Sequence, residues 1–124
     1  MRLLLLPDRL AVCRLSPDAP APAWALPGPL SSLTRTADEL SIVCPEVQVP
    51  AGVRRESGWR ALRVAGTLDF AQVGVLASLL APLADAGVSV FALSTFDTDY
   101  VLLRERDLER GRLALERAGH AVET

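Results

Sequence analysis

Proline constrains this chain more than any other residue, because eight of its nine prolines lie in the first fifty residues. Proline removes a backbone N–H and clashes with the preceding helical turn, so no long helix fits between these positions. We therefore expect short strands at 10–15, 30–36 and 40–44, with at most one helical turn at 22–26.

From Gly58 onward the sequence has the periodicities of longer elements. Residues 59–65 alternate apolar and charged side chains, as a half-buried strand does. The pattern predicts further strands at 88–94, 99–104 and 120–122, and helices from 70 or 71 to 86 and from 106 to 118, each ended by a glycine. The order strand, helix, strand, strand, helix, strand is typical of an α+β, ferredoxin-like βαββαβ fold with two helices on one face of an antiparallel sheet.

The first predicted helix has apolar residues on two faces. One stripe, which we expect to face the core, is spaced by three and four and comprises Val73, Leu76, Leu80 and Leu83. A second stripe at Val75 and Leu79 indicates packing against a neighbouring unit or subunit. Asp69 is well placed to cap the first turn.

The bulk properties exclude several function classes. The net charge is −2 and the pI is about 5.3, with arginines interleaved among acids, so nucleic acid is a poor partner. No stretch reaches the roughly 18 apolar residues that a membrane helix needs. The four leucines at 3–6 are interrupted by Pro7 too early for an export signal, and we interpret them as a strand or capping segment. A soluble, cytoplasmic protein is expected.

The residues that carry most catalytic and metal chemistry are sparse. Cys13 and Cys44 stand in apolar stretches, and the single histidine, His120, forms no recognised metal-ligand spacing with them. Free buried thiols are the favoured interpretation, with a disulfide between neighbouring strands as the alternative. We expect no catalytic residues, no metal and no cofactor.

Two loops at one end of the predicted sheet could bind a ligand. Residues 66–70 lead into a helix start, whose unpaired N–H groups and positive dipole end attract a carboxylate. Residues 94–99 form a turn whose acids can accept hydrogen bonds from an ammonium group. Together they suit an α-amino acid. Thr95 and Asp97 are also ordinary turn formers, whereas Asp99 is an acid inside an apolar strand pattern and needs a partner.

Several segments resemble the CASTOR-like ACT domain family: 56–62, 66–70, 74–77, 82–87 and, most specifically, Ser-Thr-Phe-Asp-Thr-Asp-Tyr at 94–100. The resemblance implies two tandem ACT-like units. Residues 1–53 are expected to form a degenerate N-terminal unit, and residues 54–124 a complete ACT domain.

The resemblance also implies an amino-acid site between ACT units and a homodimer formed by ACT–ACT pairing. The matching positions are Gln72, Val73 and Gly74, with Asp99 opposite them. With the two loops, the predicted ligand-binding set is Asp69, Gln72, Val73, Gly74, Thr95, Asp97, Thr98 and Asp99. Arginine is one candidate ligand among several, since arginine-sensing members carry an acid where this chain has Gln72.

Three functions follow from this sequence. The leading one is a non-catalytic module that binds or senses a small molecule, with an amino acid as the expected ligand. The alternative is a protein–protein interaction or oligomerisation module with no small ligand, in which the two loops are only structural. A small enzyme is the weakest of the three, because no acid/base or nucleophile set is present.

Overall fold

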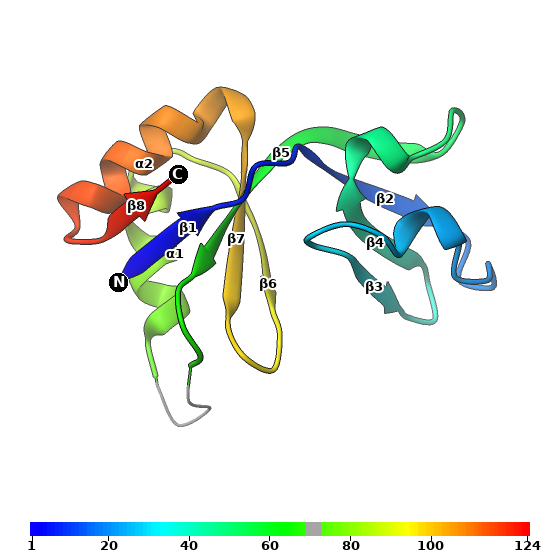
Figure 1. Cartoon of the computed structure of the whole chain (residues 1–124), viewed down its shortest axis with the longest axis horizontal. Coiled ribbons are helices and arrows are strands. Elements are labelled where there is room, and N and C mark those ends of the chain that lie inside the picture. The colour runs from blue at the N-terminus through cyan, green and yellow to red at the C-terminus, as the bar shows by residue number, and fades with distance from the viewer. Residues whose placement is uncertain (69–72) are drawn as a thin grey trace. The chain divides into compact units, whose positions relative to one another are not determined.

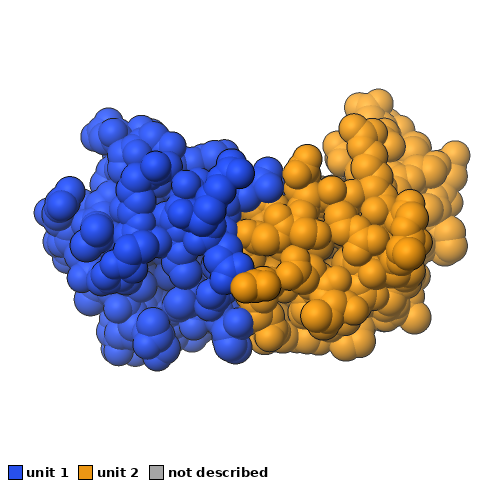
Figure 2. Space-filling view, turned by 90° about the horizontal axis from the view of Figure 1, so that it is seen from above, with its two compact units in different colours: residues 1–7, 60–124 blue, residues 8–59 orange. Residues whose placement is uncertain are grey.

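The computed structural model describes residues 1–68 and 73–124, which form two compact units (Figures 1 and 2). Unit 1 comprises Met1–Pro7 and Arg60–Thr124, and unit 2 comprises Asp8–Trp59. The predicted domain boundary between residues 53 and 54 stays a prediction. The compact units have other limits, because the first seven residues pack with the C-terminal part of the chain.

Unit 2 is a ferredoxin-like unit without α-helices in its described residues. Its elements are β2 (Leu10–Leu15), η1 (Ala23–Ala25), β3 (Ser32–Arg35), β4 (Leu40–Pro45), η2 (Glu46–Gln48) and the start of β5 (Arg54–Val64). The strands lie in the order β3-β4-β2-β5, which is the order of a βαββαβ sheet. A 3₁₀ turn replaces each helix, as the prolines around them require. This is the degenerate unit that the sequence predicts.

The core of unit 2 combines small side chains with larger ones such as Leu40 and Ile42. Ala11, Cys13 and Cys44 of the sheet are fully buried, and Ala25 of η1 covers them. Gln48 of η2 donates from Nε2 to the carbonyls of Trp24 (2.9 Å) and Pro27 (3.0 Å), which fixes the segment around η1.

Strand β5 is shared by the two units. Its residues from Arg54 to Trp59 pair with β2, and its residues from Leu62 to Val64 pair with β1. The pairing with β2 shifts by one residue between Leu10 and Val12, opposite Gly58, whose φ is 81°. An extra residue in one strand is a β-bulge, and glycine adopts positive φ there without steric cost.

Unit 1 is a complete ferredoxin-like unit with an additional strand. After β5 come α1 (Val75–Asp85), β6 (Val90–Ser94), β7 (Asp99–Arg104), η3 (Glu105–Asp107), α2 (Leu108–Arg117) and β8 (Ala121–Glu123). The order βαββαβ is confirmed. Strand β1 (Arg2–Leu5) lies between β5 and β8, antiparallel to the former and parallel to the latter, so the sheet runs β6-β7-β5-β1-β8.

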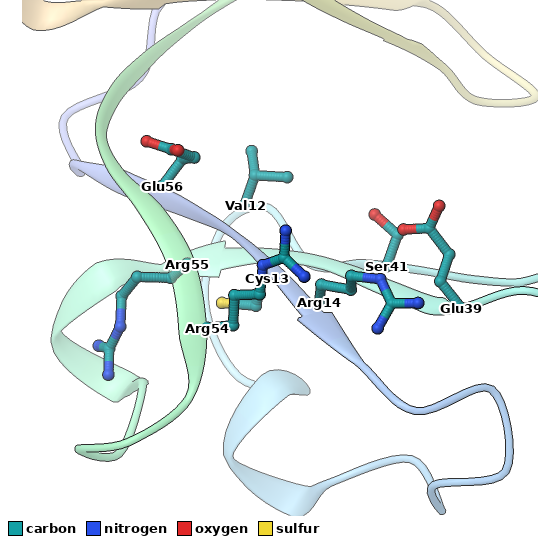
Figure 3. Close-up of a pocket in the computed structure, with 8 residues that line it drawn as sticks. All are labelled: Val12, Cys13, Arg14, Glu39, Ser41, Arg54, Arg55 and Glu56. Atoms are coloured by element: carbon teal, nitrogen blue, oxygen red, sulfur yellow. The ribbon is translucent and has the colours of Figure 1, made fainter.

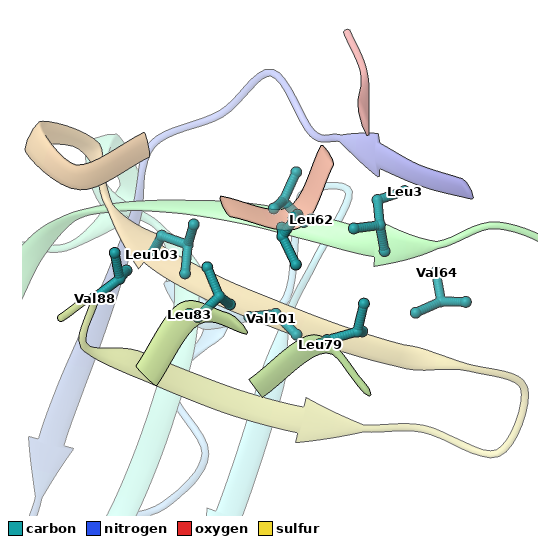
Figure 4. Close-up of a cluster of buried hydrophobic side chains, with 9 residues drawn as sticks. Leu3, Leu62, Val64, Leu79, Leu83, Val88, Val101 and Leu103 are labelled. Carbon is teal, nitrogen blue, oxygen red and sulfur yellow. The ribbon is translucent and has the colours of Figure 1, made fainter. Parts of the chain in front are cut away.

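Both helices of unit 1 pack on one face of this sheet (Figures 1 and 4). The core contains leucine and valine side chains from three strands, both helices and the segment between α1 and β6, all at most 5% exposed: Leu3, Leu62, Val64, Leu79, Leu83, Val88, Val101, Leu103 and Leu115. Leu62 and Val64 of β5, like Val101 and Leu103 of β7, are alternate residues that point into it, as the pleat of a strand requires.

The start of α1 corrects the sequence prediction. The helix begins at Val75, later than predicted, and Gly74 with φ 75° holds its N-cap position. Asp69, the predicted cap, lies outside the described residues. Val73 precedes the helix and is 92% exposed instead of belonging to the core stripe. Leu79, expected on a second face, is fully buried together with Leu83, because these two residues at i and i+4 set the face that meets the sheet.

Helix α2 approaches the sheet closely at Gly111, and its solvent side carries ion pairs. Arg112 bonds both Glu109 and Glu116, and Arg110 lies 3.1 Å from Asp107. Such exposed pairs add little stability and solvate the helix face, as the interleaving of arginines with acids predicts.

We predict that Gly111→Ala destabilises the protein, although alanine is the better helix former by about 1 kcal/mol. A Cβ at this position would lie 2.6 Å from Leu103 Cδ1 and 3.3 Å from Leu83 Cδ2. Both leucines are fully buried, and overpacking a core costs about 1–3 kcal/mol. The net expected loss is about 1 kcal/mol in the free energy of unfolding, measured by urea denaturation.

The control is Arg117→Ala at the exposed end of the same helix. This change should alter the free energy of unfolding by less than about 0.5 kcal/mol. A more stable Gly111→Ala variant would contradict the packing described for α2.

Candidate functional site

The two loops singled out by the sequence lie against each other in unit 1. The backbone N–H of Leu68 donates to the carbonyl of Asp97 (2.6 Å), and the Thr98 hydroxyl donates to the carbonyl of Val64 (2.8 Å). One bond joins backbone to backbone, and the other is buried, since Thr98 is only 4% exposed. The chain that leads toward α1 is therefore fixed to the β6–β7 turn.

The β6–β7 turn is held by its own hydrogen bonds. Thr95 N–H donates to the Thr98 carbonyl (2.8 Å), and Thr98 N–H donates to the Thr95 hydroxyl (3.3 Å). Thr95 and Thr98 thus have structural roles whether or not a ligand is present. Asp97 is exposed at the turn, and Phe96 beside it is 80% exposed. The turn presents one acid and one aromatic ring to solvent.

Asp99, an acid in an apolar strand, has a hydrogen-bond partner in Ser94. The Ser94 hydroxyl donates to Asp99 Oδ1 at 2.5 Å, and these two residues face each other across β6 and β7. Asp99 remains partly exposed. Its carboxylate is therefore oriented by Ser94 and still reachable from solvent.

The start of α1 presents backbone donors. In the described part of the chain no side chain caps the helix, and its first N–H groups follow the exposed residue Val73 and the N-cap Gly74. Such groups attract an anion. Among the described residues no hydrogen bond joins Val73 or Gly74 to Asp99. Two predicted site residues, Asp69 and Gln72, lie outside the described residues.

Unit 2 contains a cavity of about 220 Å³ that the sequence did not predict (Figure 3). Its lining mixes cations, acids and small side chains: Val12, Cys13, Arg14, Glu39, Ser41, Arg54, Arg55 and Glu56. The only sequence signal is the alternation of side chains along β2, which places Val12 and Arg14 on the face opposite to that of the core residues Ala11 and Cys13. Which residues of β4 and β5 join them depends on strand pairing, which no local pattern encodes.

Arg55 lines the cavity but has a structural role. Its guanidinium donates to the carbonyls of Val49 (3.1 Å) and Pro50, and its Nε donates to Val53 (3.2 Å). Figure 3 shows the side chain extending to the side opposite Val12 and Glu56. It closes the loop between η2 and β5.

The two cysteines are buried free thiols. Burial raises the pKa of Cys44 to about 11, with a further increase from the neighbouring Cys13 and a smaller opposing effect of Arg55. Burial likewise raises the pKa of Cys13. Because the thiolate is the nucleophile and the metal ligand, both residues are unreactive near neutral pH.

The remaining candidates for chemistry have structural partners. His120 Nδ1 lies 2.9 Å from the amino group of Met1, and Nε2 lies 3.1 Å from the Ser78 carbonyl. Within residues 1–68 and 73–124, no three His, Cys, Asp or Glu side chains are grouped so that they could hold a metal ion. In the same part of the chain, neither helix has the length and apolar character needed to cross a membrane.

Comparison with family models gives two matches. Residues 54–117 match the ACT domain, and residues 8–52 match a model described as an N-terminal domain. The human protein CASTOR3P is 36% identical over 90 residues, which cover 62% of this chain and 55% of that protein. The rat cytosolic arginine sensor for mTORC1 subunit 1 is 39% identical over 57 residues, 43% of this chain and 17% of the sensor. The chain thus spans about half or less of the curated relatives it matches.

Solved structures extend the likeness over nearly the whole chain. A protein from Agrobacterium tumefaciens is 39% identical with a TM-score of 0.94, and the match covers 98% of this chain and 91% of that one. The regulatory subunit of aspartate kinase from Thermus thermophilus has a TM-score of 0.64 at 12% identity, covering 90% and 93% of the two chains. The second match shows a shared fold.

We predict that Thr98→Val loosens the contact between the two loops. Valine keeps the shape of threonine but cannot donate to Val64, and a buried carbonyl that loses its donor costs about 1–3 kcal/mol. Urea denaturation should show that loss. Thr34→Val, at an exposed position of β3, is the matched control and should change stability by less than about 0.5 kcal/mol. Equal effects of the two changes would contradict the role given to Thr98.

Stability should fall as pH rises from 9 to 11. The Cys44 thiol keeps its proton in the folded chain up to about pH 11, whereas the unfolded chain loses it near pH 9. The folded state then binds more protons, so its stability declines with rising pH, by about 2–3 kcal/mol over two pH units.

Cys44→Ala should flatten this decline, because other groups that titrate in the range are common to both proteins. The measurement is urea denaturation at a series of pH values from 7 to 11. Parallel pH profiles of the variant and the original chain would exclude Cys44 as the cause.

Proposed function

Because the chain belongs to the ACT domain family, we propose that it is a non-catalytic regulatory module that binds a small molecule, specifically an α-amino acid. The observation that carries the proposal is the pair of hydrogen bonds from Leu68 to Asp97 and from Thr98 to Val64. They hold the segment leading to α1 against the turn that carries the predicted acids.

The chemistry on the two sides of this loop pair matches the two ends of an amino acid. The first turn of α1, which no described side chain caps, supplies N–H groups and a positive dipole end for the carboxylate. Asp97 and Asp99 supply acceptors for the ammonium group. The full proposed set remains Asp69, Gln72, Val73, Gly74, Thr95, Asp97, Thr98 and Asp99. The name of the related arginine sensor supports an amino acid as the class of ligand.

Response to the ligand is proposed to occur through pairing of ACT domains in a cytoplasmic homodimer. Strand β6 pairs only with β7 in the described sheet, so its outer edge presents backbone N–H and C=O groups that a second chain can bind. Free buried thiols support a reducing compartment.

The second candidate is an interaction module without a small ligand. It is favoured by the exposed apolar side chains beside the loops, Val73 at 92% and Phe96 at 80%. Large exposed apolar residues often belong to protein interfaces. In that case the loop contacts serve only to support the surface.

Thermal unfolding with each of the twenty amino acids at millimolar concentration separates the two candidates. A ligand present at a hundred times its Kd adds about 2.7 kcal/mol to stability, which raises Tm by several degrees. Analytical ultracentrifugation of the same samples should show a change in the dimer fraction with that ligand. No shift with any amino acid would favour the interaction module.

Asp99→Asn tests the site. Asparagine retains an oxygen that accepts the Ser94 hydroxyl, so the fold should be preserved while the charge that binds ammonium is lost. The ligand-induced shift should disappear. Asp85→Asn removes the same charge from the exposed end of α1 and should leave the shift intact. A full shift in Asp99→Asn would refute the proposed site.

A further inference from the structure

We propose that the face of the unit 2 sheet opposite its core holds a second binding site, which takes a small anion bearing a carboxylate or phosphate group. The site is built from four hydrogen-bond donors that stand in one line across four strands, here called the donor row: Thr34, Ser41, Arg14 and Arg54. It lies apart in sequence and in chemistry from the loop pair of unit 1 and does not depend on the function proposed for those loops.

Strand register establishes the donor row. Thr34 of β3 faces Ser41 of β4, Ser41 faces Arg14 of β2, and Arg14 faces Arg54 of β5. Side chains directly opposite in an antiparallel sheet point to the same face, with Cβ atoms about 4.5–5.5 Å apart. The alternate residues Cys13 and Ile42 are in the core of unit 2, so the row lies on the other face.

The two like charges in the row favour an anion between them. Arg14 and Arg54 are directly opposite each other and exposed, and like charges in that position destabilise a sheet. A carboxylate or phosphate between them replaces repulsion with charge-assisted hydrogen bonds. Arg14 is already oriented, because its Nη2 donates to the Asp38 carbonyl at 2.8 Å.

The cavity limits the size and charge of the ligand. Three residues of the row, Ser41, Arg14 and Arg54, line it (Figure 3), and its volume is about 220 Å³. Sites for larger ligands usually have about 300–1,000 Å³. Glu39 and Glu56 also line it and repel an extended polyanion. A small acid fits these conditions, and a nucleotide or nucleic acid does not.

The test is titration of the full chain with inorganic phosphate and, separately, with succinate, followed by calorimetry and by amide NMR shifts. Low ionic strength is used because salt screens exposed charges. Saturable binding of either anion, with NMR shifts at the donor row, is expected. The anion that binds more tightly shows whether the site prefers a phosphate or a carboxylate group. Absence of saturable binding by both anions would overturn the proposal.

Arg54→Gln should weaken the binding at least tenfold. Arg106→Gln removes one exposed arginine from unit 1, outside the cavity, and should leave the affinity unchanged. Asp99→Asn should also leave it unchanged, which separates this site from the amino-acid site. An equal loss in Arg106→Gln would mean general attraction to positive charge and would refute a built site.

A second measurement distinguishes a binding role of Arg54 from a structural one. Without anion, Arg54→Gln relieves the repulsion from Arg14, so its Tm should equal or exceed that of the original chain. With saturating anion the order of the two Tm values should reverse. A lower Tm of the variant in the absence of anion would make Arg54 a structural residue and overturn its assigned role.

Discussion

Both sheets depend on β5, because this one strand is paired within each unit. Residues from Arg54 to Trp59 complete the sheet of unit 2, and residues from Leu62 to Val64 hold the centre of the sheet of unit 1. Each part must present its own alternation of side chains, and the bulge at Gly58 provides the extra residue between them. A slip of one residue in either part would exchange its buried and exposed faces.

Local patterns were enough to predict the order of elements in unit 1 and the ends of both helices. Gly87 and Gly119 follow α1 and α2 closely, as predicted. The start of α1 was predicted too early because the apolar spacing continues back to Val73. Gly74 has a left-handed backbone conformation, and the helix begins at the next residue, Val75. The leucines at 3–6 predicted a strand or capping segment, but no local signal places β1 between β5 and β8, since these partners are far away in the sequence.

The candidate sites show the same division between local and distant information. Composition identified the two loops, and a lone acid in a strand identified Asp99 as needing a partner. Sequence did not reveal that Thr98 is a buried donor to Val64, since threonine is an ordinary turn residue. The donor row was equally hidden: Thr34, Ser41, Arg14 and Arg54 come from four separate strands, and only their pairing aligns them.

The placement of β1 affects how the chain can reach its fold. Leu3 pairs with Val64 on one side and with Val122 on the other, so the sheet of unit 1 joins segments from both ends of the sequence. Contacts of such large sequence separation slow folding, because the entropy cost of closing a long loop comes before the contacts stabilise the chain. Unit 2 is built from one continuous segment, Asp8–Trp59. During synthesis it can therefore fold while unit 1 still awaits its last strand.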